Sequence, residues 1–257
     1  METIGGRAAS LLIGLATSLA IVAVTLPIFL NPVWVAFEQG RAQATAWTGF
    51  TEPELRGATD AILADLVLEP PEFDVAIAGA PVLNERERGH MRDVRGVFLG
   101  FFALTLTVAL AAAVVIATRR RSAGQVRTWG AVRDGALTLV AALVVGGIVS
   151  LAAFDVLFET FHRVFFAGGS YTFDPATERL VQLFPFQFWQ ESAIAVGAVC
   201  IALAGVVAVL ANRRAAASVA AAPAEHAPEH ASEPAVEPAA AVSSDAANSM
   251  SPSGSPR

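Results

Sequence analysis

Residues 96–118, GVFLGFFALTLTVALAAAVVIAT, decide the fold, because they form a run of 23 residues without a charged side chain. An α-helix needs about 20 mainly apolar residues to cross the hydrocarbon core of a bilayer. Three further stretches, residues 8–30, 136–154 and 193–211, are of similar length and also lack charged side chains. The sequence therefore predicts an all-α membrane protein with four transmembrane helices.

The charges between these stretches predict how the chain is oriented. Residues 119–134 carry five arginines against one acidic residue, and Arg213 and Arg214 follow the fourth stretch. Segments rich in arginine remain on the cytoplasmic side of a membrane. The acidic segments 31–95 and 155–191 are then expected to form a small extracytoplasmic cap, with both chain termini in the cytoplasm.

The composition excludes several kinds of chemistry. All 17 basic residues among the 257 are arginine, so no lysine is present as a nucleophile, Schiff base or P-loop cation. Cys200 is the only cysteine, which leaves no internal disulfide or CxxC motif. The net charge of −6 disfavours a nucleic-acid partner, which usually requires a basic surface. A transporter or channel is disfavoured because charged groups are absent from all four apolar stretches.

The C-terminal segment 215–257 is rich in Ala, Pro, Glu and Ser. Such a composition buries too little apolar surface to offset the entropy lost on folding. We expect a disordered cytoplasmic tail that follows a membrane domain of residues 1–214. The tail histidines, His226 and His230, are interpreted as part of a solvated linker rather than as metal ligands.

The first cap segment contains two predicted elements. Residues 52–68 place apolar side chains near one face of a helix, and Thr51 with Glu54 forms the pattern of a capping box. The prolines that follow are expected to end this helix. Residues 73–80 are a short run bounded by Pro and Gly, which indicates a strand paired with residues 81–83 or with the other cap segment.

Two histidines lie just outside predicted spans on the same side of the membrane. His90 precedes the second span by six residues, and His162 follows the third by eight. An α-helix rises 1.5 Å per residue, so both side chains would stand at a similar height if each helix continued straight out of the bilayer. The two imidazoles could therefore meet at the outer interface.

Helical spacing places two carboxylates near each histidine. A carboxylate on one ring nitrogen fixes the tautomer and raises the basicity of the other nitrogen, as a general base requires. Four arginines nearby could bind an anion or a developing oxyanion. The carboxylates are Glu87 and Asp93 near His90 and Asp155 and Glu159 near His162, and the arginines are Arg86, Arg88, Arg92 and Arg163.

Other interpretations of these residues are open. The histidines could be interfacial anchors at the lipid headgroups, or could bind zinc together with Glu87, although no HExxH motif supports a metal site. The phenylalanine-rich runs 161–166 and 183–189 fit an aromatic belt at the interface and also the lining of an acyl-chain cleft. The absence of a GxSxG motif argues against a serine hydrolase.

Three motifs carry a resemblance to a known family. They are NERERGHMRDV at residues 84–94, DVLFETFHRVFF at 155–166 and LFPFQFW at 183–189. The chain resembles, over about residues 8–211, the four-helix membrane family that contains the lipoprotein intramolecular transacylase Lit. The resemblance implies a cap over four helices in the bacterial cytoplasmic membrane. It also implies that His90 and His162 are catalytic residues in a cleft between cap and membrane, with no metal or organic cofactor.

The implied reaction moves the sn-2 acyl chain of a diacylglyceryl lipoprotein, held among membrane lipids in the outer leaflet, to the α-amino group of its N-terminal cysteine. The α-ammonium, with an ordinary pKa of about 7.7–8.0, must first lose a proton. One histidine would accept this proton and the other would protonate the departing glyceryl oxygen. The competing hypotheses are a non-enzymatic four-span scaffold whose cap binds an envelope partner and a zinc-dependent lipid hydrolase.

Overall fold

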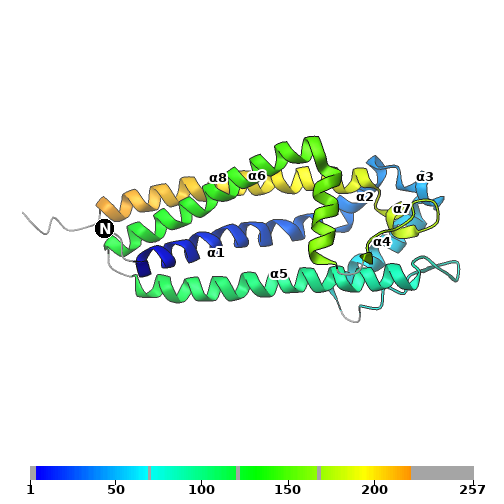
Figure 1. Ribbon diagram of the computed structural model, residues 1–257, viewed down its shortest axis with the longest axis horizontal. Helices are drawn as coiled ribbons and strands as arrows, with labels where there is room; N and C mark the ends of the chain where they lie inside the picture. Colours follow the sequence, from blue (N-terminus) through cyan, green and yellow to red (C-terminus); the bar gives the residue numbers. More distant parts are fainter. Residues whose placement is uncertain (1–3, 69–70, 120–121, 167–168, 221–257) are drawn as a thin grey trace, which may run out of the picture. The chain divides into compact units, whose positions relative to one another are not determined.

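The computed structural model describes residues 4–68, 71–119, 122–166 and 169–220 (Figure 1). All of them belong to one compact unit, Met1–Ala222. The predicted disordered tail lies outside the described residues from position 221 onward, and so do its two histidines.

Within the described residues, four helices are long and apolar enough to cross a membrane. They are α1 (Ile4–Phe29), α5 (Glu85–Thr118), α6 (Ser122–Phe165) and α8 (Phe186–Ala220). Each overlaps one predicted span, which confirms the all-α fold with four apolar helices. Helix α8 also includes residues 215–220, where the sequence predicted the disordered tail to begin. This alanine-rich run has a high helix propensity and continues the preceding helix.

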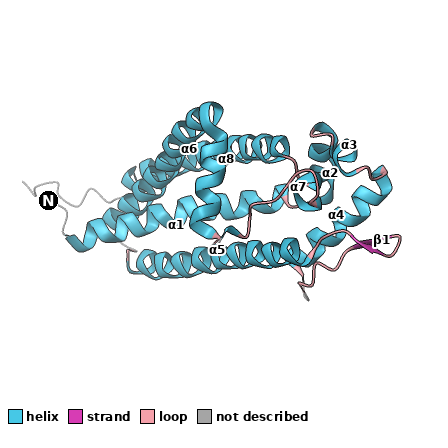
Figure 2. Cartoon of the chain, turned by 45° about the vertical axis from the view of Figure 1, so that its right-hand side comes forward, coloured by secondary structure: helices cyan, strands magenta, loops and turns pink. Residues whose placement is uncertain are grey.

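Helix α1 contacts all three other long helices (Figures 1 and 2). At its crossing with α6, Gly14 faces Gly135 so closely that a side chain at Gly135 would collide with the Gly14 backbone. Ser18 Oγ donates a hydrogen bond of 3.0 Å to the Gly135 carbonyl oxygen at the same crossing. Helix α6 packs most extensively on α8, whereas α5 makes few contacts with α6. Helix α5 is therefore held in the bundle mainly by α1.

The shorter elements gather at one end of the long helices (Figure 1). They are α2 (Pro32–Arg41), α3 (Ala44–Thr48), α4 (Glu52–Val67), β1 (Ala76–Ile77), β2 (Ala80–Pro81) and α7 (Arg179–Leu183). Together these elements come from both segments that the sequence assigned to a cap.

Helix α4 confirms the helix predicted at residues 52–68, and it begins with the expected capping box. The backbone nitrogen and Oγ1 of Thr51 donate to Glu54 Oε2 at 2.9 and 2.7 Å. The strand predicted at residues 73–80 is wrong in extent, because only Ala76–Ile77 pair with Ala80–Pro81. Ala78 and Gly79 both have positive φ and make a tight turn that ends the strand after two residues.

Side chains from both cap segments form one hydrophobic core. Val35 of α2, Ile62 of α4 and Leu183 of α7 are each at most 3% exposed and belong to one cluster. At its centre, Gln39 Nε2 donates to Thr59 Oγ1 at 2.9 Å and to the Leu183 carbonyl oxygen at 3.0 Å. A buried amide is stable there because its hydrogen bonds are made within the protein. The two cap segments therefore fold together.

Helix α6 does not continue straight out of the bundle as the sequence analysis assumed. Ala153 has φ −151° and ψ 47°, which interrupts the helical backbone. The residues after it turn toward α5 in both views (Figures 1 and 2). Phe154 and Phe158 then pack edge-on against Phe186 at the start of α8, with ring centroids 5.1 and 6.3 Å apart. The turned end of α6, residues 154–165, is thus held by aromatic contacts with α8.

Candidate active site

The two predicted histidines meet. His90 lies in the second turn of α5, and His162 lies in the last turn of α6. Their ring centroids are 6.1 Å apart and their planes are inclined by only 25°, so the imidazoles stack. The expected encounter is confirmed, but it arises from the kink in α6 and not from two straight helices of equal height.

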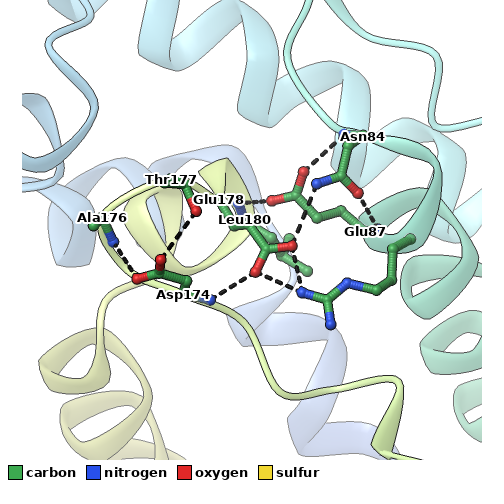
Figure 3. Close-up of polar contacts among 8 residues, drawn as sticks. Asn84, Glu87, Asp174, Ala176, Thr177, Glu178 and Leu180 are labelled. Carbon is green, nitrogen blue, oxygen red and sulfur yellow. Dashed lines mark hydrogen bonds and ion pairs between the residues drawn. The ribbon is translucent and has the colours of Figure 1, made fainter.

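The beginning of α5 is fixed by a capping box that includes a predicted site residue, Glu87. Asn84 Oδ1 accepts from the Glu87 backbone nitrogen at 3.0 Å, and Glu87 Oε2 accepts from the Asn84 nitrogen at 2.7 Å (Figure 3). The other oxygen of Glu87 accepts from the Leu180 nitrogen at 2.6 Å. Glu87 is 1% exposed, so its carboxylate joins α5 to α7 and does not orient His90.

Arg86 is tied to the loop before α7. Its guanidinium contacts both oxygens of Glu178 at 2.5 and 2.6 Å, and Glu178 also accepts from the Asp174 nitrogen at 2.6 Å (Figure 3). The Arg86 guanidinium also lies over the Phe173 ring, 4.9 Å from its centroid. A cation held by a carboxylate and an aromatic face stabilises this loop beside the histidines.

The other arginines that were expected to contact an anion also lie beside carboxylates. Arg92 contacts Glu85 at 2.6 Å, and Arg163 contacts Glu159 at 3.0 Å. Arg88 lies 3.4 Å from Asp74 and donates to a backbone carbonyl. Each arginine near the histidines therefore already has a carboxylate partner, because the cap is acidic.

A backbone carbonyl, and not a carboxylate, orients His162. Its Nδ1 lies 2.7 Å from the Phe158 carbonyl oxygen one helical turn earlier. A carbonyl only accepts, so Nδ1 carries the hydrogen and Nε2 of the neutral ring keeps its lone pair. Glu159 instead accepts from Arg163 Nε and from the Tyr171 hydroxyl, each at 3.0 Å. Asp155 is exposed, and the described part of the chain shows no hydrogen bond from it to His162.

His90 is buried, and its Nδ1 atom has no hydrogen-bond partner in the described residues. The residue is only 6% exposed. Burial, followed by the charge of His162, lowers the pKa of His90 to about 4, against an opposing effect of Asp93. Asp93 therefore affects the pKa of His90 through the electrostatic field of its carboxylate. The His90 ring is neutral at neutral pH.

Aromatic rings surround the histidine pair. The ring centroid of Phe166 lies 4.7 Å from that of His90 and 5.4 Å from that of His162. The ring centroid of Phe158 lies 4.1 Å from that of His162. The aromatic run that contains Phe166 could be recognised in the sequence, whereas Phe173 and Tyr171 were not predicted to lie in the site. Their rings lie 5.4 Å from His90 and 5.1 Å from His162, respectively. No local pattern marks these two residues, because the loop that carries them is positioned by Glu178 and Glu87.

The zinc hypothesis required Glu87 beside both histidines. Within the described ranges, no three His, Cys, Asp or Glu side chains come together as a set of metal ligands. Both oxygens of Glu87 are instead occupied by backbone nitrogens of Asn84 and Leu180. The arrangement that the site does offer is a pair of imidazoles in aromatic surroundings, which suits proton transfer and hydrogen bonding.

Comparisons with known proteins agree with the resemblance seen in the motifs. A family model for "Lipoprotein intramolecular transacylase Lit" matches residues 10–189, which include both histidines. The structure of the membrane integral lipoprotein intramolecular transacylase Lit from Bacillus cereus has a TM-score of 0.63 at 16% identity, and the match covers 84% of this chain and 98% of that chain.

A form of the same Bacillus cereus protein with a histidine-to-alanine substitution has a TM-score of 0.62 at 14% identity, with 84% and 96% of the two chains covered. These likenesses show the shared fold. The curated proteins contain no match to the sequence. The family match spans more than half of the chain and agrees with the four apolar helices. The chain therefore belongs to the lipoprotein intramolecular transacylase Lit family and is a multi-pass membrane acyltransferase.

Proposed function

We propose that His90 and His162 together catalyse transfer of the sn-2 acyl chain of a diacylglyceryl lipoprotein to the α-amino group of its N-terminal cysteine. The observation that supports this most strongly is the stacking of the two imidazoles, 6.1 Å apart, among aromatic rings. One ring nitrogen of His162 is free to accept a proton. The product is a lyso-form lipoprotein whose total mass equals that of the substrate.

His162 acts as the general base. Its Nδ1–H is held by the Phe158 carbonyl, so Nε2 is the nitrogen that accepts a proton. The attacking amine has an ordinary pKa of about 7.7–8.0, and it must be neutral to attack the ester carbonyl. As the C–N bond forms, the nitrogen loses a further proton, which His162 accepts. A positioned base of this kind is typically worth about 10²- to 10⁴-fold in rate.

His90 acts mainly as a neutral hydrogen-bond donor. A neutral imidazole carries one N–H, and its low pKa of about 4 keeps His90 in this form. We infer that this N–H stabilises the oxyanion of the tetrahedral intermediate. The proton that His162 received then passes to the glyceryl oxygen as the C–O bond breaks. This assignment refines the expectation that the second histidine is simply an acid.

The surroundings of the pair favour transfer over hydrolysis. The amine and the ester belong to one lipid-modified molecule, so the attack is intramolecular and its entropic cost is low. The rings of Phe158, Phe166 and Phe173 line the histidines with apolar surface. Apolar walls exclude water, which would otherwise compete with the amine. They also suit an acyl chain.

The orientation in the membrane is part of the proposal. The arginine-rich segment 119–134 and the pair Arg213–Arg214 favour the cytoplasmic side of a bacterial cytoplasmic membrane. The cap and the histidines then face the outside, where the substrate lies in the outer leaflet. We retain residues 1–214 as the membrane domain and 215–257 as a cytoplasmic tail in this proposal, apart from the helical residues 215–220.

Mass spectrometry of N-terminal lipopeptides tests the proposal. The protein, its His90→Ala form and its His162→Ala form are expressed in a bacterial host that makes diacylglyceryl lipoproteins. Only the unsubstituted protein should move one acyl chain from glycerol to the amine at constant total mass. Asp155→Asn is the matched control, because Asp155 lies on the same turned end of α6 as His162 but is exposed, and it should retain conversion.

Two outcomes would contradict the proposal. If the amine stays free despite confirmed expression of the protein, this reaction is not catalysed on that substrate. If conversion survives either histidine substitution, the mechanism is wrong. A non-enzymatic scaffold would in addition show the same cellular phenotype with and without the histidines.

A further inference from the structure

A pocket that is separate from the histidine pair opens between α2 and the first turns of α8. Its volume is about 320 Å³, at the lower end of the range usual for small-molecule sites. Among the described residues, no lining residue of this pocket makes a ring contact or a hydrogen bond with His90 or His162. Its lining residues are Phe37, Glu38, Arg41, Glu191, Ile194 and Ala195. The pocket is therefore not part of the site already described.

The lining combines charged and apolar groups in an order that matches a membrane interface. Helix α2 follows the first span directly, and Glu191 precedes the fourth predicted span by two residues. Ile194 and Ala195 belong to that span, so the apolar wall continues toward the hydrocarbon region. A ligand with a polar head and an apolar body fits such a wall.

Two carboxylates of the pocket, Glu38 and Glu191, share one guanidinium, that of Arg41. Arg41 Nε lies 2.5 Å from Glu191 Oε2, and Gln187 donates to the other Glu191 oxygen at 2.8 Å. Glu38 Oε2 is 3.6 Å from Arg41 Nε and has no hydrogen bond. The Glu38 residue is only 3% exposed. The Arg41 guanidinium thus pairs closely with Glu191 and at a longer distance with Glu38, so the charged lining residues carry one more acidic group than basic groups.

A buried carboxylate without a hydrogen bond is costly, and it calls for a proton or a cationic partner. Burial, and next the neighbouring Glu191, raise the pKa of Glu38. A donor placed in the pocket would give Glu38 its missing hydrogen bond and balance its charge. A primary ammonium supplies three N–H donors on a compact cation.

We propose that this pocket binds the primary ammonium group of an amphiphile, with Glu38 as its main acceptor and Phe37, Ile194 and Ala195 along its apolar part. Two molecules offer this chemistry at the outer interface: an ethanolamine phospholipid and an amino-terminal lipopeptide. The proposal stands without the transacylation mechanism, because it concerns binding and uses neither histidine.

Native mass spectrometry of the full chain in detergent tests the proposal. The probes are dioleoyl phosphatidylethanolamine, phosphatidylcholine with the same chains, and phosphatidylglycerol with the same chains. We expect the ethanolamine lipid to be retained at least fivefold more than the other two. Choline has no N–H, and glycerol has no positive charge, so neither can replace the ammonium.

Two variants separate the pocket from the rest of the surface. Glu38→Gln keeps the shape of the side chain but removes its negative charge, and it should lower retention of the ethanolamine lipid to the level of phosphatidylcholine. Glu52→Gln is the control, because Glu52 is an exposed cap carboxylate that forms an ion pair with Arg56 at 3.9 Å. It should leave retention unchanged. Thermal unfolding of both variants checks that they are folded.

A competition experiment identifies the source of the ammonium. It uses the His162→Ala form, so that no substrate is converted, and a diacylglyceryl-cysteine lipopeptide with either a free or an acetylated amine. Displacement of the phospholipid by the free-amine lipopeptide alone assigns the pocket to lipoprotein, and no displacement assigns it to the phospholipid. Equal retention of all three lipids, or an ethanolamine preference that persists in Glu38→Gln, would overturn the proposal.

Discussion

Helices α5 and α6 each bring one histidine to the same point, but they do so in different ways. Helix α5 runs without interruption from Glu85 to Thr118, and its start is fixed by the Asn84 capping box. Helix α6 breaks at Ala153, and its last residues, 154–165, turn toward α5 (Figures 1 and 2). A local sequence signal therefore positions His90, whereas packing against α8 positions His162. The comparison predicts that His162 on α6 is easier to move out of its position in the site than His90 on α5.

The largest expected loss of activity comes from rotating the end of α6 that carries His162. One alanine inserted between Val156 and Leu157 turns the following residues by about 100° and shifts them by about 1.5 Å. His162 would then face away from His90 although both histidines are present. We expect conversion of lipopeptides to fall at least about 100-fold, as for loss of a general base. An alanine inserted between Ala239 and Ala240 in the tail is the control, and conversion within threefold of normal in the α6 variant would contradict the model of a positioned pair.

The next effect concerns the carboxylate that anchors α5 to the loop before α7. Glu87→Gln replaces a buried acceptor of two backbone N–H groups by an amide that fits only partly. Loss of a buried hydrogen bond costs about 1–3 kcal/mol, so the melting temperature should fall by several degrees. Glu85→Gln weakens the ion pairs of an exposed carboxylate with Arg92 and Arg88, and exposed pairs contribute about 0–1 kcal/mol each. An equal loss in the two variants, measured by thermal unfolding in detergent, would show that Glu87 is not an anchor.

A pH effect follows from the buried, neutral His90. Its pKa is about 4 in the folded protein against 6.5 for an ordinary histidine. Between these values the unfolded chain binds more protons than the folded chain, so stability falls as pH decreases from about 6.5 to 4. His90→Gln should remove this part of the pH dependence, which melting temperatures across that range would detect. Parallel curves for the two proteins would mean that His90 is not buried in its neutral form.

The smallest effect distinguishes the ring of Tyr171 from its hydroxyl. The ring lies 5.1 Å from His162, and the hydroxyl donates to Glu159 at 3.0 Å at an exposed position. Because His162 is held by a carbonyl, Tyr171→Phe should change the rate of conversion by less than about threefold, in line with a single exposed hydrogen bond. Tyr171→Ala should reduce it more. A loss in Tyr171→Phe as large as that in His162→Ala would place Glu159 in the proton path.

Most of the fold could be predicted from the sequence, and so could the identity of the two central residues. The four apolar runs, the capping box at Thr51 and the positions of His90 and His162 are all local patterns. The partners of the histidines were predicted less well. Glu87, Glu159 and the arginines have the right spacing on a helix, but the structure engages them with each other and with backbone nitrogens.

By itself the sequence determined that the chain has four helices able to span a membrane, an acidic cap sequence and a pair of histidines beside it. These properties depend on hydrophobic length, charge and spacing along one segment, which are present in the chain before it folds. Only the tertiary structure decided that α6 turns at Ala153 and that a carbonyl holds His162. It also decided that His90 Nδ1 and Glu38 Oε2 are buried without a hydrogen bond within the described residues. Those properties depend on which segments pack together. At the end of α6, residues 154–165, aromatic contacts with α8 determine the direction of the helix, and no local sequence pattern predicts them.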